Sequence, residues 1–197
     1  MADRPDLTSA ARSMAALITG VPDDRLGAPT PCPKYTVGDL LDHIGGLTVA
    51  FTSAATKDLG ESGSPPPGDA ANLAGDWRTR IPADLEKLGA SWREPGAWQG
   101  MTRAGGVDMP GEVAGVVALD ELIVHGWDLA RATGQDFVPD GASLDAVAGF
   151  YAMFSGPDDE AARGDAFGKV VPVADDAPKL DRVIGLSGRD PSWSASA

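Results

Sequence analysis

The stretch Asp120-Glu-Leu-Ile-Val-His-Gly-Trp-Asp-Leu-Ala-Arg-Ala-Thr-Gly134 decides the fold, because it ends a long helix and holds one of only two histidines. Working back from it, apolar residues recur at helical spacing from Gly111 onward, on more than one side of the helix. Gly134 is a suitable residue to end it. The pattern predicts a central helix over 111–133.

Three further helices are predicted upstream, over 6–21, 37–56 and 69–92, from apolar residues three or four positions apart. Thr36 and Asp39 mark the start of the second of these. Pro82 falls inside the third and is expected to kink or split it. Residues 57–68 are rich in Gly, Ser and Pro and are long for a tight turn, which favours a crossover. The fold class is therefore all-α, a four-helix bundle with one long crossover.

The rest of the chain predicts smaller elements around this bundle. A Gly-Gly pair within 98–110 indicates a small hairpin or an irregular excursion. Short helices are expected over 143–154 and 180–186. We therefore expect a bundle over 1–135 and a helical extension over 136–197 packed on it, as a single domain overall.

Composition excludes several classes of function. Sixteen Lys and Arg against 29 Asp and Glu give a net charge of −13, which disfavours nucleic acid and anionic membranes as partners. No apolar run reaches the roughly 18 to 20 residues that span a bilayer, and the first residues lack the apolar core of a secretory signal. We expect a cytoplasmic protein. A single cysteine cannot build a thiolate cage, so any metal site must use His, Asp or Glu.

The residues best suited to chemistry are Glu121, His125 and His43. Glu121 and His125 are four positions apart, so both side chains can reach one point on a helix face. If the helices over 37–56 and 111–133 are neighbours, His43 joins them as two imidazoles and one carboxylate, the donors of an open zinc site. The alternatives are a surface pair at 121 and 125 and a hydrogen-bonded core histidine at 43.

Two acids nearby could act on these histidines. Asp39 could accept a hydrogen bond from His43, or it could be a first-turn acid favoured by the helix dipole. Asp128 could be a further ligand, an acid/base group, or the partner of Arg131. Asp42 points about 100° away from His43 and is expected to be solvated.

Three other side chains have a chemical and a simpler interpretation. Cys32 could be a redox group or a small buried apolar residue. Trp127 is expected to be a core residue rather than a platform for substrate. Arg103 could guide an anionic substrate or be a solvated loop charge.

Three segments carry a family resemblance: 30–43 (TPCPKYTVGDLLDH), 121–134 (ELIVHGWDLARATG), and 167–173 (FGKVVPV) with Gly188-Arg-Asp-Pro. Together they resemble actinobacterial metal-binding proteins related to the N-terminal domain of mycothiol-dependent maleylpyruvate isomerase, in the DinB-like superfamily. The resemblance covers nearly the whole chain and implies the DinB bundle. It also implies a metal, typically zinc, bound by His43, Glu121 and His125; nickel accepts the same nitrogen and oxygen donors. Tyr35 stands where closer relatives usually have Trp.

The resemblance further implies that the metal activates a low-molecular-weight thiol such as mycothiol or bacillithiol. The expected function is a thiol transferase or thiol-dependent isomerase, acting on an electrophile. Residues 135–197 are too few for the isomerase's second domain, which puts maleylpyruvate isomerisation itself in doubt. The alternatives are a non-catalytic metal or small-ligand binder, such as a sensor or stress-response protein, and a metal-free structural bundle. A homodimer is expected by analogy with DinB-like bundles.

Overall fold

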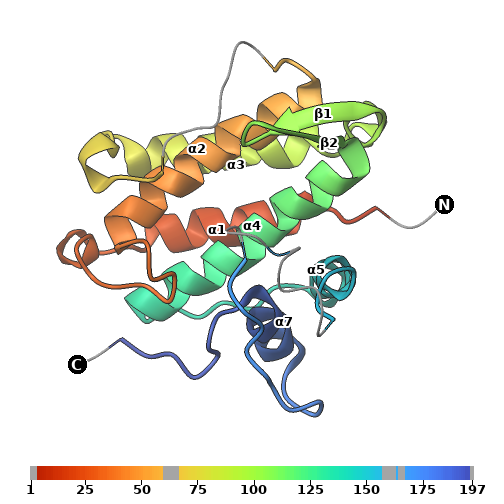
Figure 1. The fold of residues 1–197 in the computed structure, drawn as a ribbon. Helices are drawn as coiled ribbons and strands as arrows, with labels where there is room; N and C mark the ends of the chain where they lie inside the picture. The colour runs from red at the N-terminus through yellow and green to blue at the C-terminus, as the bar shows by residue number, and fades with distance from the viewer. Residues whose placement is uncertain (1–3, 60–66, 157–162, 164–166, 196–197) are drawn as a thin grey trace.

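The computed structural model describes residues 4–59, 67–156, 163 and 167–195, and most of these lie in helices. Four long helices form the bundle: α1 (Leu7–Thr19), α2 (Val37–Thr56), α3 (Trp77–Ser91) and α4 (Gly111–Thr133). α1 packs against α3 and α4, and α2 packs against the same two helices (Figure 1). The predicted all-α four-helix bundle is confirmed, and in it α2 and α4 are direct neighbours.

Local signals in the sequence set the ends of α2 and α4. The Thr36 side chain accepts from the Asp39 backbone N–H, and the Asp39 carboxylate accepts from the Thr36 N–H at 2.9 Å, which completes a capping box. α4 ends at Gly134, whose φ of 70° lies in the left-handed region. Both helices have the bounds that the sequence predicts.

The third helix differs from its prediction. α3 starts at Trp77, and residues Ala70–Asn72 form a separate 3-10 turn, η2, whose N-cap is Asp69. The chain is extended at Leu73, so the helix starts anew after Gly75. Pro82 does not split α3, because it lies in the second turn and removes a single backbone hydrogen bond.

The connection from α2 to α3 is a crossover, although residues 60–66 of it lie outside the described residues. The chain leaves α2 at Lys57 and is next described beside the start of the same helix, where the Ala70 N–H donates to Asp39 at 2.8 Å. α3 therefore runs in the same direction as α2 (Figure 1). This topology places the chain around Gly68 directly over the N-terminal half of α2.

A short antiparallel hairpin joins α3 to α4. The 3-10 helix η3 (Pro95–Trp98) leads into β1 (Met101–Ala104) and β2 (Val107–Pro110), with Gly105 and Gly106 as the turn. Both glycines have positive φ, 57° and 80°, as a two-residue hairpin turn requires. Of the two predicted alternatives for this segment, the hairpin is the one formed.

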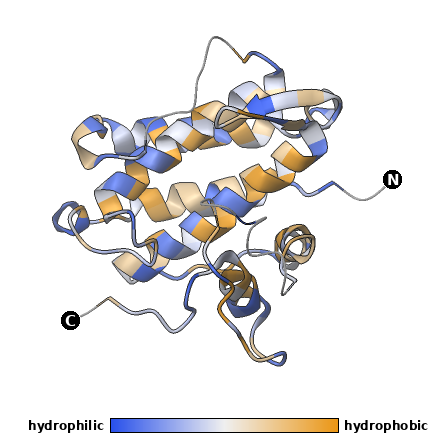
Figure 2. Cartoon of the chain, in the orientation of Figure 1, coloured by the Kyte–Doolittle hydropathy of each residue, from blue (hydrophilic) through white to orange (hydrophobic). Residues whose placement is uncertain are grey.

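The C-terminal part of the described chain packs on α4. α5 (Gly141–Ala152) contacts α4, and α7 (Lys179–Ser187) contacts α5. Their buried side chains Leu144, Val147, Tyr151 and Val183 belong to the same hydrophobic core as the bundle. Hydrophobic and hydrophilic stretches alternate along the bundle helices, whose apolar sides form this core (Figure 2). Among the described residues, no helix is long and apolar enough to cross a membrane.

Candidate metal centre

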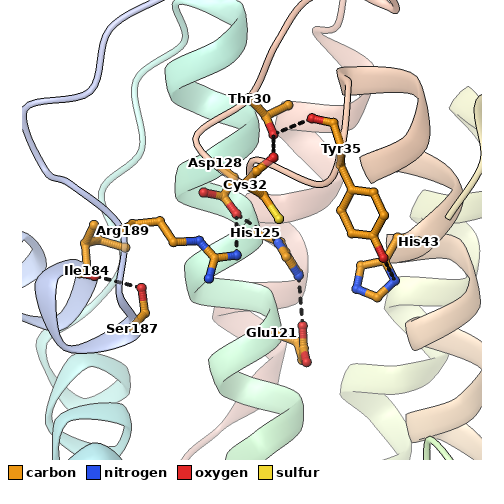
Figure 3. Close-up of polar contacts among 10 residues, drawn as sticks. All are labelled: Thr30, Cys32, Tyr35, His43, Glu121, His125, Asp128, Ile184, Ser187 and Arg189. Carbon is orange, nitrogen blue, oxygen red and sulfur yellow. Dashed lines mark hydrogen bonds and ion pairs between the residues drawn. The ribbon is translucent and has the colours of Figure 1, made fainter. Parts of the chain in front are cut away.

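Two neighbouring helices bring the predicted ligands together. His43 comes from α2, and Glu121 and His125 come from successive turns of α4. One ligand atom from each of the three side chains lies within 4.8 Å of the others. The donor set is two imidazoles and a carboxylate, in agreement with the arrangement expected from their spacing (Figure 3).

His125 lies between two carboxylates, one at each ring nitrogen. Its Nε2 is 3.0 Å from Glu121 Oε2, and its Nδ1 is 2.9 Å from Asp128 Oδ2. The His125 side chain is 8% exposed and that of Asp128 is fully buried, whereas Glu121 is 29% exposed. Asp128 therefore fixes the ring so that Nε2 faces Glu121 and the candidate metal position.

Asp128 is itself bound by an arginine from the C-terminal segment. Arg189 Nη2 donates to Asp128 Oδ2 at 3.1 Å, and the Arg189 side chain is 13% exposed. Arg189 follows Gly188, which ends α7 with a φ of 91°. The predicted partner, Arg131, donates instead to the Trp193 carbonyl. Helical spacing could not identify Arg189, because 61 residues separate it from Asp128. The signal for it in the sequence was Gly188-Arg-Asp-Pro after a short helix.

The second histidine has a different partner. Tyr35 Oη lies 3.5 Å from His43 Nδ1, and the ring centres are 4.9 Å apart. The His43 and His125 rings meet edge to face with centres 5.0 Å apart. A Tyr35 contact at Nδ1 leaves Nε2 of His43 free to face the other ligands. From the sequence, Tyr35 stood out only as a change from Trp, without a predicted role at the site.

The segment after the crossover lies close over His43. A side chain at Gly68 would collide with the Asp39 carbonyl and with His43 itself, so only glycine allows this approach. The Gly68 backbone also hydrogen-bonds Tyr35. His43 is thus held between Tyr35 and the returning chain.

The two histidines have opposite electrostatic surroundings. Burial, with the nearby charge of His125, lowers the pKa of His43 to about 4. Burial also opposes charge on His125, but its hydrogen bonds to Asp128 and Glu121 outweigh that effect and raise its pKa to about 10. Burial would raise the pKa of Glu121, yet the hydrogen bond and charge of His125 lower it. At neutral pH the site therefore holds a neutral His43, a carboxylate and a protonated His125.

These residues fit a divalent metal. The 3.0 Å between His125 Nε2 and Glu121 Oε2 is close to the roughly 3.4 Å that separates two ligands of one tetrahedral zinc ion. A metal ion would replace the proton that His125 shares with Glu121, and His43 would offer an unprotonated nitrogen without competition from protons. Three protein ligands leave a position for a further group.

The acids on α2 have other contacts. The Asp39 carboxylate accepts from Thr36 and Ala70, which is the role of a helix-capping acid. Asp42 accepts from the Asp69 N–H at 3.1 Å.

Three further side chains were given a chemical and a simpler interpretation from the sequence: Cys32, Trp127 and Arg103. Cys32 is buried, within electrostatic reach of Tyr35 and Arg189. Trp127 packs in a small cluster with Val124 and Ile184. Arg103 is bound to Asp108 across the hairpin by two contacts of 2.8 and 3.1 Å.

One buried acid next to a candidate ligand was not predicted from the sequence as a functional residue. Asp120 is 3% exposed and hydrogen-bonds Tyr151 of α5. Burial, together with the charge of Glu121, raises the pKa of Asp120 to about 7. A polar residue beside Glu121 in an otherwise apolar stretch was the signal for it.

Comparison with known proteins gives two kinds of relative. Two uncharacterized proteins of Mycobacterium tuberculosis, one from strain CDC 1551 and one from strain H37Rv, are each 29% identical over 183 residues. These alignments cover 90% of this chain and 92% of each relative. The crystal structure of the mycothiol-dependent maleylpyruvate isomerase is similar with a TM-score of 0.59 at 16% identity, over 76% of this chain and 70% of that one.

The solved structure shares the fold, which agrees with the bundle described above. The sequence profile of the mycothiol maleylpyruvate isomerase N-terminal domain matches residues 7–130, which include α1 to α3, most of α4 and all three candidate ligands. The chain therefore belongs to the mycothiol maleylpyruvate isomerase N-terminal domain family.

Proposed function

We propose that the protein binds a divalent metal, zinc or nickel, through His43, Glu121 and His125. The observation that carries the proposal is that three donors from two helices lie within 4.8 Å of one another, with His125 buried and the other two partly buried. Imidazole and carboxylate donors suit zinc, and they also accept nickel. Elemental analysis of the purified protein, beside the His125→Ala variant, tests this step.

We further propose that a low-molecular-weight thiol, mycothiol or a similar compound, is the cosubstrate. Membership of the family supports a thiol, because the solved relative is a mycothiol-dependent enzyme. A divalent ion bound here would lower the pKa of a coordinated thiol and so supply a thiolate at neutral pH. The reaction class that follows is thiol transfer to an electrophile, or isomerisation through a thiol adduct.

The chain's own residues prepare this chemistry in distinct ways. His43 is neutral at neutral pH and presents a nitrogen lone pair. Glu121 supplies one negative charge, which partly neutralises a dication and leaves it able to attract a thiolate. Asp128 accepts from His125 Nδ1 and holds the ring orientation, and Arg189 offsets the charge of Asp128 in its buried position.

Turnover of an electrophile separates an enzyme from a binding protein. The metal-loaded protein would be incubated with mycothiol and a panel of electrophiles, with the His125→Ala variant as control, and both free thiol and the electrophile would be followed. We expect wild-type protein to accelerate conversion of at least one electrophile, with loss of free thiol if the reaction is a transfer and with the thiol regenerated if it is an isomerisation, and the variant to leave the background rate unchanged. Stoichiometric metal without accelerated conversion of any electrophile would favour the alternative, a non-catalytic metal- or ligand-binding bundle.

The analogy with DinB-like bundles implies a homodimer, and the sequence predicts a cytoplasmic protein divided into a bundle over 1–135 and an extension over 136–197. We keep these as parts of the proposal. Sedimentation equilibrium would test the first, with a mass twice the 20.2 kDa of the chain as the expected result.

A further inference from the structure

A groove runs along the outer face of α2 and begins at a candidate metal ligand. It has a volume of about 680 Å³, and its lining includes His43, Gly46, Ser53 and the turn of the hairpin. From His43 to Ser53 is ten residues of helix, or about 15 Å at 1.5 Å per residue. We call this cavity the α2 groove. His43 therefore belongs both to the groove and to the candidate metal centre.

A second, separate void lies on the inner side of α2. Leu47 lines the groove, and it also borders this small void of about 10 Å³, which reaches Glu121. Glu121 itself is 29% exposed. His43 is therefore the candidate ligand through which the groove meets the metal centre.

The lining offers hydrogen bonds of both kinds without an excess of positive charge. Ser53 and the amide of Asn72 both donate and accept, and the carboxylate of Asp42 accepts. Arg80 and Arg103 donate, but each already faces carboxylates. Arg80 lies 3.6 and 3.8 Å from Asp76 and Asp84, and Arg103 is paired with Asp108.

The mixture of donors and acceptors in the groove, without free positive charge among its described residues, favours a ligand rich in hydroxyl groups. In a chain of net charge −13 with both arginines paired, a polyanion would gain little from the groove. Hydroxyl groups, which both donate and accept, match a lining of mixed donors and acceptors.

The floor of the groove gives independent support. Gly45 and Gly46 occupy the middle of α2, where each glycine costs up to about 1 kcal/mol of helix stability relative to Ala. A Cβ at Gly46 would meet nothing within 4 Å, so packing within the described chain does not require a glycine there. A ligand lying along the helix explains why this position carries no side chain.

From these observations we propose that the α2 groove binds the polyhydroxylated body of the thiol cosubstrate, with its sulfur directed to the metal beside His43. This inference rests on the proposed function. It assigns Gly46, Ser53, Asn72, Arg80 and Arg103 to thiol recognition rather than to the metal. The probe of this class is mycothiol, whose sulfur is carried on an acetylated cysteine joined to an amino sugar and inositol. N-acetylcysteine serves as the same sulfur end without the polyol.

The test blocks the groove without touching the metal ligands. Gly46→Phe fills the groove, and Gly149→Phe is the matched control, because Gly149 is also an exposed mid-helix glycine, in α5, whose Cβ would meet nothing within 4 Å. Both proteins and the wild type would be loaded with Co²⁺, and binding of each thiol followed by the sulfur-to-cobalt charge-transfer absorption.

We expect wild-type protein and Gly149→Phe to bind mycothiol at least tenfold more tightly than N-acetylcysteine. Gly46→Phe should lose that margin and keep its affinity for N-acetylcysteine and for cobalt. Asn72→Ala, which removes one hydrogen-bonding group, should weaken mycothiol binding about 2- to 10-fold.

Other outcomes separate the two proposals. A Gly46→Phe protein that keeps the full preference for mycothiol, or a wild type without any preference, overturns the groove assignment alone. Failure of the wild type to bind cobalt, or of both thiols to bind the cobalt-loaded wild type, overturns the proposed function and the groove assignment with it.

Discussion

His43 and His125 have ring centres only 5.0 Å apart, yet their surroundings move their pKa values in opposite directions. Two carboxylates hold a proton on His125, while burial keeps His43 neutral. A metal ion that binds here must therefore displace one proton, from His125, and none from His43.

This asymmetry predicts how zinc affinity depends on pH. The pKa of His125 is about 10 and that of His43 about 4, so between pH 6 and 9 only His125 gives up a proton on binding. Affinity should rise about tenfold for each pH unit across that range, because proton competition weakens as pH approaches 10. Competition with a chromophoric chelator in buffers from pH 6 to 9 measures this slope. An affinity that is flat over the range would contradict the assigned protonation states.

The contact of Asp128 with Arg189 predicts a role for the C-terminal segment in metal binding. Removing Arg189 leaves the buried Asp128 carboxylate without its arginine partner, and the support that Asp128 gives to the orientation of His125 is weakened. Asp128→Asn and Arg189→Gln should each lower zinc affinity about 10- to 100-fold, with His43, Glu121 and His125 intact.

Arg131→Gln is the matched control, because Arg131 also lies between α4 and the C-terminal segment but bonds the Trp193 carbonyl. It should leave zinc affinity within twofold of wild type by the same chelator competition. Equal losses in the Arg189→Gln and Arg131→Gln variants would mean that packing of the segment, not its contact with Asp128, supports the site.

Between helices, α4 contacts α5 through the buried acid Asp120, which hydrogen-bonds Tyr151. The Asp120 carboxyl keeps its proton up to about pH 7 in the folded chain, whereas in the unfolded chain it loses it near 3.8. Its contribution to stability is thus lost as pH rises from about 4 to 7. Asp120→Asn cannot ionise, so its thermal midpoint relative to wild type should increase over that range by several degrees and then level off.

Thermal melts of the metal-free proteins between pH 4 and 8, followed by circular dichroism, measure this difference. The sign follows from the raised folded-state pKa, since the penalty falls on the ionised acid. A difference that stays constant with pH would show that Asp120 does not titrate in the folded protein.

The elements that the sequence predicted best are those with strong local signals. α2 and α4 have their predicted bounds, because Thr36 with Asp39 starts one helix and Gly134 ends the other. The predicted start of α3 was wrong by eight residues. The apolar repeat includes Leu73, but the backbone is extended at Leu73 and the helix starts only at Trp77. Apolar spacing records which side of a segment is buried, and it does not record where a helix must restart.

The residues of the candidate site also differ in whether local sequence signals predict them. Glu121 and His125 follow from helical spacing, and His43 was the only other histidine available. Tyr35 and Arg189 could not be derived from spacing, because a loop and a separate helix place them. Their positions depend on how the crossover and the C-terminal segment fold back on α2 and α4.

At the scale of the whole molecule, the site links helices that are distant in sequence. His43 and His125 are held by α2 and α4, and Arg189 comes from the segment after α7. A ligand that binds only the folded chain stabilises all of it by mass action.

Zinc should therefore raise the thermal midpoint of the wild-type protein. At free zinc of 100 times the dissociation constant the gain is about 2.7 kcal/mol. For a chain of this size that corresponds to about 5–10 °C. Differential scanning calorimetry with and without zinc measures the shift, and the His43→Ala variant should show none. An equal shift in the variant would assign the effect to zinc bound elsewhere.

The most direct test of the central claim is the metal content of protein purified without a chelating tag, determined by elemental analysis beside the His125→Ala variant. The account predicts about one equivalent of zinc or nickel per chain in the wild type and its loss in the variant. Wild-type protein that is metal-free and cannot be loaded with added zinc, or a variant that keeps its full metal content, would contradict it.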